Sequence, residues 1–464
     1  MKIFNGDLKK IALQSININY SYLDIQKISE SLSEVLPTYY KYGLAASNDI
    51  NTILIYLALL YNNCTFLIFD PSVLKNKNNF IKSIGLDNII SHIDLKELDQ
   101  NNFKKEKINN NNIHFHLYKK ELDSKKIRRN EPSILLNTSG SSGIPKIVRI
   151  SYQNLISNTI GIIESLNLTC QDKSISTLPL FYTYGLSILN THMFSGGTFY
   201  ITDKSIIKKS FADELSSFKP TIFSGVPSTY HMLRKMDYFY IKQPFVRKIT
   251  QAGGALDLGI QKEILEICSS KKSFYVMYGQ TEATARISCF NLSNFPNKIG
   301  SVGLPLRNLS VEINDRDDNS KIGKIFVKGP SITSGYISTF DDLFLEPRTR
   351  TLDTGDLGYL DDDGFLFITG RSSRFCKING KRYNLDVIEK EYNSVNLKKI
   401  NAVSNDQFLF LFSIIPISKK TLKILGIHPT LIKNILIKNI PLKANGKVDY
   451  SYLLELAEKI LTKK

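Results

Sequence analysis

The chain is predicted to be an α/β protein, and three patterns predict this class. Residues 1 to 372 alternate helix-like patterns with short apolar strands, which is typical of layered, mostly parallel α/β subdomains. Between Val311 and Phe367 short strands are separated by Asp/Gly turns, which indicates a small antiparallel β-barrel-like unit. After Arg371 a helix, a strand and a closing helix follow, which predicts a small α+β unit at the C-terminus.

Composition places the chain among ordinary globular proteins. It has 464 residues, 42% of them apolar and 22% charged, which is enough for two or three domains. The apolar run Ile53–Leu60 breaks at Tyr61 and resumes at Phe66–Phe69, so it predicts a helix, a turn and a strand rather than a transmembrane segment. The N-terminus has no apolar core of a secretory signal, and the five cysteines form no C-x-x-C pair. We therefore expect a reduced, cytoplasmic protein.

The most informative segment is a loop rich in glycine and hydroxyl side chains. It follows a strand candidate, Ile134–Leu136, and reads N-T-S-G-S-S-G-I-P-K up to Lys146. Glycines let backbone N–H groups turn towards an anion, while hydroxyls and a lysine add donors and charge. The segment therefore predicts a phosphate-binding loop, although its order is not that of the common P-loop. Its predicted phosphate-binding residues are Thr138, Ser139, Gly140, Ser141, Ser142, Gly143 and Lys146.

This loop resembles the T-S-G-[ST]-[ST]-G-x-P-K signature of the AMP-forming, adenylate-forming ligases. That family includes acyl-CoA synthetases, the adenylation domains of peptide synthetases and the luciferase superfamily. A Gly/Ser loop on its own is about as often a plain turn or linker. Three further segments resemble the same family in the family's order, and together they extend the resemblance over essentially the whole chain.

The second segment is Tyr278–Glu282, which follows the strand candidate Phe274–Met277. The resemblance implies that Tyr278 packs on adenine, that Gly279 helps to bind the nucleotide, that Thr281 contacts the α-phosphate and that Glu282 holds Mg²⁺. A carboxylate suits this ion, which prefers oxygen ligands and bridges phosphates. The resemblance also implies that the backbone of Gly253, Gly254 and Ala255 passes close to the adenine. Without the resemblance, the segment would be read as a strand end followed by a helix cap.

The third segment contains Asp356 and Arg371, and the fourth is Pro441–Asp449. The resemblance implies that Asp356 accepts hydrogen bonds from the ribose hydroxyls, a role that suits an acceptor-only carboxylate, and that Arg371 contacts the nucleotide. It makes Lys447 the mobile catalytic lysine, whereas a lone lysine in this basic chain would be a solvated charge.

The resemblance also implies the domain division: residues 1–372 form an adenylation core and residues 373–464 a mobile lid, with the hinge at Ser373. Aspartate or lysine is usual at that hinge, so the serine is a departure. Lys377 and Arg382 would aid nucleotide binding and catalysis, and Gly380 would line a thiol channel. The plain alternative for this loop is a basic β-turn.

The function implied by the resemblance is ATP-dependent activation of a small carboxylic acid to an acyl-adenylate, followed by transfer to a thiol. The cofactors would be ATP and Mg²⁺, and the acceptor would be coenzyme A or the phosphopantetheine of a carrier protein. Tyr182, Gly185 and Gly225 would line the acid pocket. Because Tyr182 lacks the charge that would hold an α-ammonium group, it favours acids other than amino acids. An amino-acid-adenylating enzyme and a catalytically inactive nucleotide-binding scaffold are the alternatives.

The net charge of +17 is concentrated at the C-terminus, where residues 373–464 carry a net +10. Basic patches bind nucleic acids, but no helix-turn-helix or RNA-binding signature accompanies this one, so no nucleic-acid partner is expected. An acidic acyl carrier protein would suit the charge, although a biased genome composition would explain it equally well. The Asn- and Lys-rich segment 101–130 is expected to be a solvated surface excursion.

Overall fold

The structure is a computed structural model that describes residues 7–38, 40–76, 84–98, 103–110, 113–120, 133–138, 146–316, 321–344, 351–372, 374–378, 381–395, 399–405, 407–417, 427–443 and 447–462. The chain divides into two compact units: unit 1 comprises Met1–Ser310 with Lys328–Leu352, and unit 2 comprises Val311–Val327 with Asp353–Lys464. The functional boundary predicted between residues 372 and 373 stays a prediction, and Ser373 lies outside the described residues.

Unit 1 contains two large mixed sheets. The order of the nine-stranded sheet is β16 (Leu304–Pro305), β15 (Ser288–Asn291), β14 (Ser273–Tyr278), β13 (Lys248–Gln251), β12 (Ile222–Gly225), β10 (Lys173–Ser176), β11 (Thr198–Ile201), β1 (Ile11–Ser15) and β2 (Ile18–Ser21). The order of the eight-stranded sheet is β19 (Tyr336–Ile337), β9 (Lys146–Ser151), β8 (Ser133–Thr138), β4 (Phe66–Phe69), β3 (Tyr42–Ala45), β5 (Asn88–Ser91), β7 (Ile113–Lys120) and β6 (Phe103–Asn110). Both have parallel centres and antiparallel edges, as the alternating pattern predicts.

The described helices of unit 1 are α1 (Tyr22–Ser31), α2 (Ile50–Tyr61), α3 (Val73–Asn76), α5 (Tyr152–Leu166), α6 (Thr183–Ser195), α7 (Lys209–Phe218), α8 (Pro227–Lys235), α9 (Phe239–Lys242) and α10 (Leu258–Ile267). Helix α2 contacts β1 of one sheet and β7 of the other, and α5 likewise contacts β15 and β9. This position explains why α2 is apolar on all sides, since nearly all of its side chains are buried. Among the described residues, every helix is too short or too polar to cross a bilayer.

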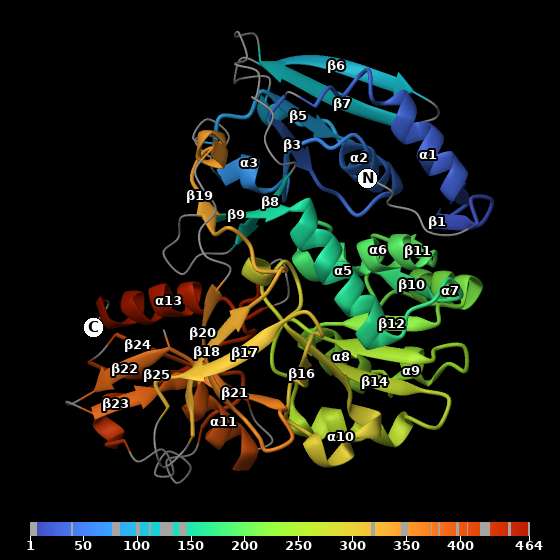
Figure 1. Cartoon of the computed structure of the whole chain (residues 1–464). Helices are drawn as coiled ribbons and strands as arrows, with labels where there is room; N and C mark the ends of the chain where they lie inside the picture. The colour runs from blue at the N-terminus through green and yellow to red at the C-terminus, as the bar shows by residue number, and fades with distance from the viewer. Residues whose placement is uncertain are drawn as a thin grey trace. The chain divides into compact units, whose positions relative to one another are not determined.

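The segment expected to be a surface excursion instead forms a long hairpin, β6 and β7, at the edge of the eight-stranded sheet (Figure 1). The prediction was wrong for β7, because Ile113, Phe115 and Leu117 are buried. Asn and Lys residues make the segment polar on average, so its composition does not reveal the alternation of buried and exposed side chains that is typical of a half-buried strand. Strand β6 is mostly exposed, in agreement with its lysines, and residues 121–130 lie outside the described residues.

Unit 2 contains a four-stranded sheet where the barrel-like unit was expected. Its order is β17 (Ser310–Asn314), β18 (Gly323–Lys328), β20 (Thr351–Leu360) and β21 (Leu366–Arg371). The C-terminal part contains the hairpin β22 (Phe375–Ile378) and β23 (Lys381–Asn384), helices α11 (Leu385–Val395) and α13 (Tyr450–Thr462), and the sheet of β24 (Ile400–Ser404), β25 (Leu409–Ser413) and β26 (Ile432–Leu436).

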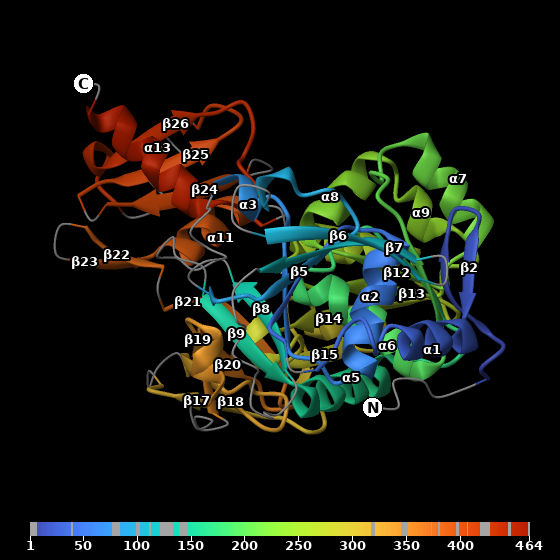
Figure 2. The ribbon, with the colours of Figure 1, turned by 90° about the horizontal axis from the view of Figure 1, so that it is seen from above.

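Helices α11 and α13 cover opposite faces of the three-stranded sheet (Figure 2). Leu409 and Leu411 pack in the cluster that contains residues of α11, whereas Phe410 and Phe412 pack in the cluster of α13. Successive side chains of a strand point to opposite faces, so an unbroken apolar run is what a strand between two helices requires. The α+β character predicted for this part of the chain is confirmed.

Because α2 is buried, shortening one of its apolar side chains is expected to lower the stability of the protein strongly. Leu57 is fully buried, so Leu57→Ala should lower the free energy of unfolding by about 2–5 kcal/mol, the range for such cavities. Leu258→Ala in α10 is the matched control, because Leu258 is 45% exposed and should change stability by less than about 1 kcal/mol. Urea unfolding followed by circular dichroism measures both; equal losses would contradict the layered position of α2.

Candidate functional site

Three predicted site positions follow neighbouring parallel strands of the nine-stranded sheet. Gly225 ends β12, Gly253 follows β13, and Tyr278 ends β14. The strands pair in parallel, so their carboxyl ends meet at one edge of the sheet. Ligands of open α/β sheets bind outside this edge. The structure therefore brings these three positions, predicted to bind the nucleotide or the acid, to one edge of the sheet.

The turn after β14 depends on Gly279. A Cβ atom at this position would lie 2.0 Å from the carbonyl oxygen of Ala285 and 2.7 Å from the Cα of Arg286. No side chain fits there, so only glycine lets the chain fold back on itself between β14 and β15. The predicted residues Thr281 and Glu282 lie in this loop, in a short 3₁₀ turn, η2 (Thr281–Ala283).

The same loop contains a strained residue, Thr284, with φ of 68° and ψ of −52°. These angles, together with an N–H···O bond of 2.8 Å from Ala285 to Ala283, define a γ-turn of the rare type with positive φ. The Thr284 hydroxyl donates to the carbonyl of Ser331 at 2.7 Å. Strain of this kind persists only where its surroundings hold it, and it is typical of functional loops.

The side chain of Asn158 in α5 binds the backbone of the loop between β14 and β15. Its amide nitrogen donates to the carbonyls of Ala283 (3.4 Å) and Arg286 (2.8 Å), and its oxygen accepts from the Arg286 backbone N–H at 3.1 Å. Sequence reasoning missed this residue. An asparagine inside an amphipathic helix gives no local signal, since its partners lie more than 120 residues further along the chain.

Glu282, Tyr336 and Lys146 form a row beside the loop. The Tyr336 hydroxyl donates to Glu282 Oε1 at 2.6 Å, and Lys146 Nζ lies 4.9 Å from the centre of the Tyr336 ring. Burial and this hydrogen bond raise the pKa of Tyr336 well above its usual value, so the hydroxyl remains a donor at neutral pH. The partner role of Tyr336 was not predicted.

A magnesium ion fits this row chemically. Glu282 is partly exposed, and the bond from Tyr336 engages one of its two carboxylate oxygens. Within the described ranges, no three His, Cys, Asp or Glu side chains cluster, so Glu282 would act as a single protein ligand. One carboxylate is sufficient for Mg²⁺ where phosphate oxygens and water complete the coordination. Glu282 could therefore hold this ion beside a bound triphosphate.

The predicted acid pocket begins at Tyr182, which precedes α6. The Tyr182 hydroxyl lies 2.5 Å from the place where a Cβ of Gly253 would be, and Gly253 has a φ of +88°. Burial raises the pKa of Tyr182 to about 12, so it is neutral. Gly185 allows α6 to approach the Pro179 carbonyl, where a Cβ would lie at 2.5 Å. Next to Tyr182, the hydroxyls of Thr183 and Thr281 are 3.0 Å apart, which links this pocket to the predicted α-phosphate contact.

In unit 2, Asp356 and Arg371 face each other across β20 and β21 and form an ion pair, with Nε and Oδ1 3.1 Å apart. The Asp356 side chain is 6% exposed and that of Arg371 is 56% exposed. The structure thus brings together the two residues predicted to contact the ribose and the nucleotide.

The backbone N–H of Lys443 donates to the carbonyl of Lys447, and that of Asp449 donates to the carbonyl of Pro441. The backbones of Lys377 and Arg382 pair across the hairpin β22–β23. Thr138 ends β8, and Gly254 and Ala255 follow Gly253. The predicted positions outside the described residues are Ser139, Gly140, Ser141, Ser142, Gly143, Ser373 and Gly380.

Comparisons with known proteins agree with this geometry. The family model described as AMP-binding enzyme matches residues 58–337. A 2-succinylbenzoate–CoA ligase of Listeria monocytogenes serovar 1/2a is 32% identical over 240 residues, which cover 52% of this chain and 49% of the relative. A ligase of the same name from Lactococcus lactis is 22% identical over 393 residues, covering 82% and 80%. For the first relatives it matches, such as the ligase of Listeria monocytogenes, the chain spans about half of the relative's length.

Solved structures match over nearly the whole chain. The o-succinylbenzoate CoA synthetase MenE of Bacillus subtilis, in complex with its acyl-adenylate OSB-AMP, has a TM-score of 0.75 at 19% identity and covers 95% of this chain and 94% of its own. ATP-bound MatB of Rhodopseudomonas palustris has a TM-score of 0.77 at 19% identity, covering 99% and 98%. The predicted fold class is confirmed.

The tight turn at Gly279 generates a prediction. Gly279→Ala should destabilise the protein by about 1–3 kcal/mol or more, because backbone atoms rather than a flexible side chain block the added carbon. It should also weaken binding of a fluorescent ATP analogue, since Thr281 and Glu282 would shift. Gly259→Ala is the control, because its added carbon would meet only the Asp257 carboxylate. Normal stability and nucleotide affinity of Gly279→Ala would contradict this account.

Proposed function

Because the chain belongs to the AMP-binding enzyme family, we propose that it uses ATP to activate a carboxylic acid as an acyl-adenylate and then passes the acyl group to a thiol. One observation carries the proposal: Lys146 of β9 and Tyr336 of β19 form a row with Glu282, which follows β14 at the sheet edge where α/β proteins bind ligands. This row offers a cation and a carboxylate that both contact one tyrosine, which suits a triphosphate with its Mg²⁺.

In the proposed first step a carboxylate oxygen of the acid bonds to the α-phosphorus of ATP, and the bond from that phosphorus to the bridging oxygen breaks to release pyrophosphate. Such reactions depend on positioning and on neutralising charge. Lys146 and Glu282, the latter through Mg²⁺, would hold the leaving pyrophosphate. Thr281 would contact the α-phosphate, Asp356 and Arg371 the ribose and nucleotide, and Lys447 the attacking carboxylate.

In the proposed second step the thiol attacks the acyl carbon, and AMP leaves. The names of the relatives support coenzyme A as the acceptor and make 2-succinylbenzoate one acid to test. A carrier protein with a phosphopantetheine thiol is the second candidate, favoured by the net charge of +10 on residues 373–464. Gly380 would line the thiol channel and Ser373 would be the hinge for this step, while Lys377 and Arg382 would aid nucleotide binding.

Two alternative functions make different predictions. An amino-acid-adenylating enzyme needs an anion near the acid's α-ammonium group, and the neutral Tyr182 does not supply one. An inactive scaffold would bind ATP without turnover, although Glu282 and Lys447 are both present.

The free state of all five cysteines supports a cytoplasmic location.

The assignment of Lys447 is tested by ATP–pyrophosphate exchange with a panel of fatty, aromatic, hydroxy, dicarboxylic and amino acids. Lys447→Ala should lower exchange on the order of 10²–10³-fold, as loss of a charge-stabilising donor does, while ATP affinity stays nearly constant. Lys443→Ala, in the same segment, should exchange like the wild type. Exchange at the wild-type rate by Lys447→Ala would refute its role, and exchange with amino acids alone would favour the first alternative.

The choice of acceptor is tested by the salt dependence of thioester formation. If an acidic carrier protein is the acceptor, its acylation should slow markedly above about 0.15 M salt, where the Debye length falls below roughly 8 Å. Efficient turnover with free coenzyme A, together with no acylation of any carrier protein, would exclude carrier steering.

A further inference from the structure

Arg286 is a buried cation without an ion-pair partner in the described part of the chain. It follows the γ-turn loop, and 3% of its surface is exposed. Its Nη1 donates to the Ala285 carbonyl at 3.1 Å, its Nη2 to Ser187 Oγ at 3.4 Å, and its Nε to Met277 Sδ at 3.5 Å. None of these acceptors carries a charge. By contrast, the half-buried Arg374 in unit 2 pairs with both Asp386 and Glu389.

The guanidinium of Arg286 is held rigidly. Its Cζ lies 4.2 Å from the centre of the Tyr184 ring, a cation–π contact, and the Tyr184 hydroxyl is bonded to Thr250. The Ser187 hydroxyl donates to the Tyr184 carbonyl at 2.8 Å, which leaves its oxygen to accept from Arg286. These contacts leave one N–H on each terminal nitrogen of Arg286 without an acceptor among the described residues. Two such N–H groups match the two oxygens of a carboxylate.

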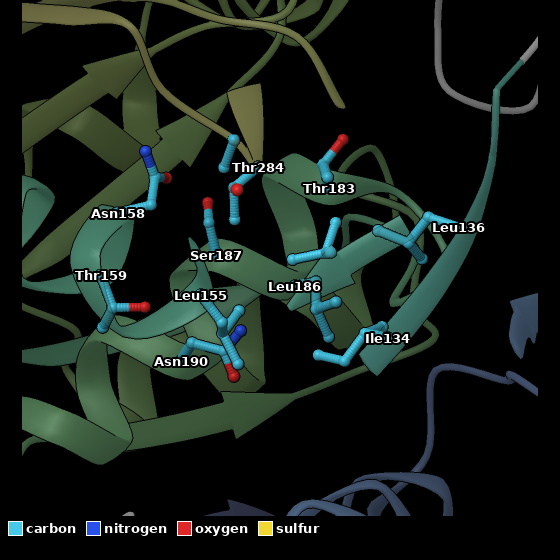
Figure 3. Close-up of a pocket in the computed structure, with 12 residues that line it drawn as sticks. Ile134, Leu136, Leu155, Asn158, Thr159, Thr183, Leu186, Ser187, Asn190 and Thr284 are labelled. Carbon is cyan, nitrogen blue, oxygen red and sulfur yellow. The ribbon is translucent and has the colours of Figure 1, made fainter. Parts of the chain in front are cut away.

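Arg286 lines a cavity that adjoins the predicted reaction site. This cavity, of about 20 Å³, lies between α5, α6 and strands β12–β14. A second cavity, of about 10 Å³, is lined by Thr183 and Thr284 and shares one residue, Ser187, with the first (Figure 3). Thr183 and Ser187 are four residues apart on α6, which is about 6 Å along the helix axis. Ser187 therefore separates a cavity lined by Thr183, which contacts Thr281, from the cavity lined by Arg286.

The size and chemistry of these two cavities restrict what can occupy them. Each cavity has room for about one water molecule, so even a short acid needs side chains such as that of Ser187 to move aside, and a long acyl chain or an aromatic ring needs a larger rearrangement. A buried charge that lacks a partner is costly, and a bound anion would remove that cost. A small anionic group at the far end of a short acid satisfies both conditions.

We propose that Arg286 binds a second carboxylate on the acid that the enzyme activates, so that the substrate is a short dicarboxylic acid. This inference rests on the proposed function. One carboxylate would react beside Thr281, and the other would pair with Arg286, about one helical turn away. Arg286 would thus determine specificity without touching the reacting atoms, while Ser187 and Tyr184 orient it.

The test compares ATP–pyrophosphate exchange for acids of equal carbon number: succinate with butyrate, glutarate with pentanoate and adipate with hexanoate. The wild type should prefer at least one dicarboxylate over its partner by about 10–100-fold in kcat/KM, as expected for bonds between charged groups. Arg286→Met should abolish that preference, and Arg286→Lys should keep part of it. Arg234→Met is the matched control, because Arg234 is an exposed arginine whose loss should leave the preference intact.

The outcomes separate the two proposals. Exchange with monocarboxylates at least as good as with dicarboxylates, or a preference that survives Arg286→Met, would overturn the role of Arg286 and leave the adenylating function standing. Absence of exchange with every acid would overturn both. Circular dichroism and ATP affinity show whether Arg286→Met folds; if it does not, the wild-type ratio and Arg286→Lys decide the question.

Discussion

The site of unit 1 depends on one close contact, the approach of the Ala285 carbonyl to Gly279 at the end of β14. The two strands β14 and β15 are antiparallel neighbours, and the loop between them must return within the space that a Cβ atom would occupy. Because the loop turns back so tightly, Thr281 and Glu282 lie at the carboxyl edge of the sheet, and Arg286, which follows them in the chain, is buried. A group predicted to face the nucleotide and a buried cation thus come from one reversal of the chain.

The loop maintains its shape at an energetic cost that its neighbours offset. A positive φ at a β-branched residue such as Thr284 costs roughly 1–3 kcal/mol. The Thr284–Ser331 bond and the three bonds of Asn158 compensate for it, and Asn158 belongs to α5, which contacts both sheets. A rigid loop suits a reaction in which the protein mainly positions groups, since little reorganisation is left to occur during the step.

Local patterns predicted correctly the elements for which they gave a clear signal. The runs at Phe66–Phe69 and Phe274–Met277 are strands, and Gly279 lies at a turn, because strand and turn preferences act over a few neighbouring residues. The composition of residues 101–130 was misleading at β7, where Ile113, Phe115 and Leu117 are buried. Local patterns also gave no indication of the roles of Asn158 and Arg286, because nothing in their own segments distinguishes them from ordinary helix or strand residues, and they did not predict the contact of Tyr336 with Glu282.

The sequence by itself determined the order of the motifs, the alternating α/β layers and the family, since these depend on residues close together in the chain. Only the tertiary structure decided which motifs meet within unit 1. Tyr336 reaches Glu282 across 54 residues, Thr183 reaches Thr281 across 98, and Asn158 reaches Arg286 across 128. Such contacts follow from strand order and register, which bring the carboxyl ends of parallel strands to one edge. The burial of Arg286 beside a cavity is likewise a property of packing, which no local pattern contains.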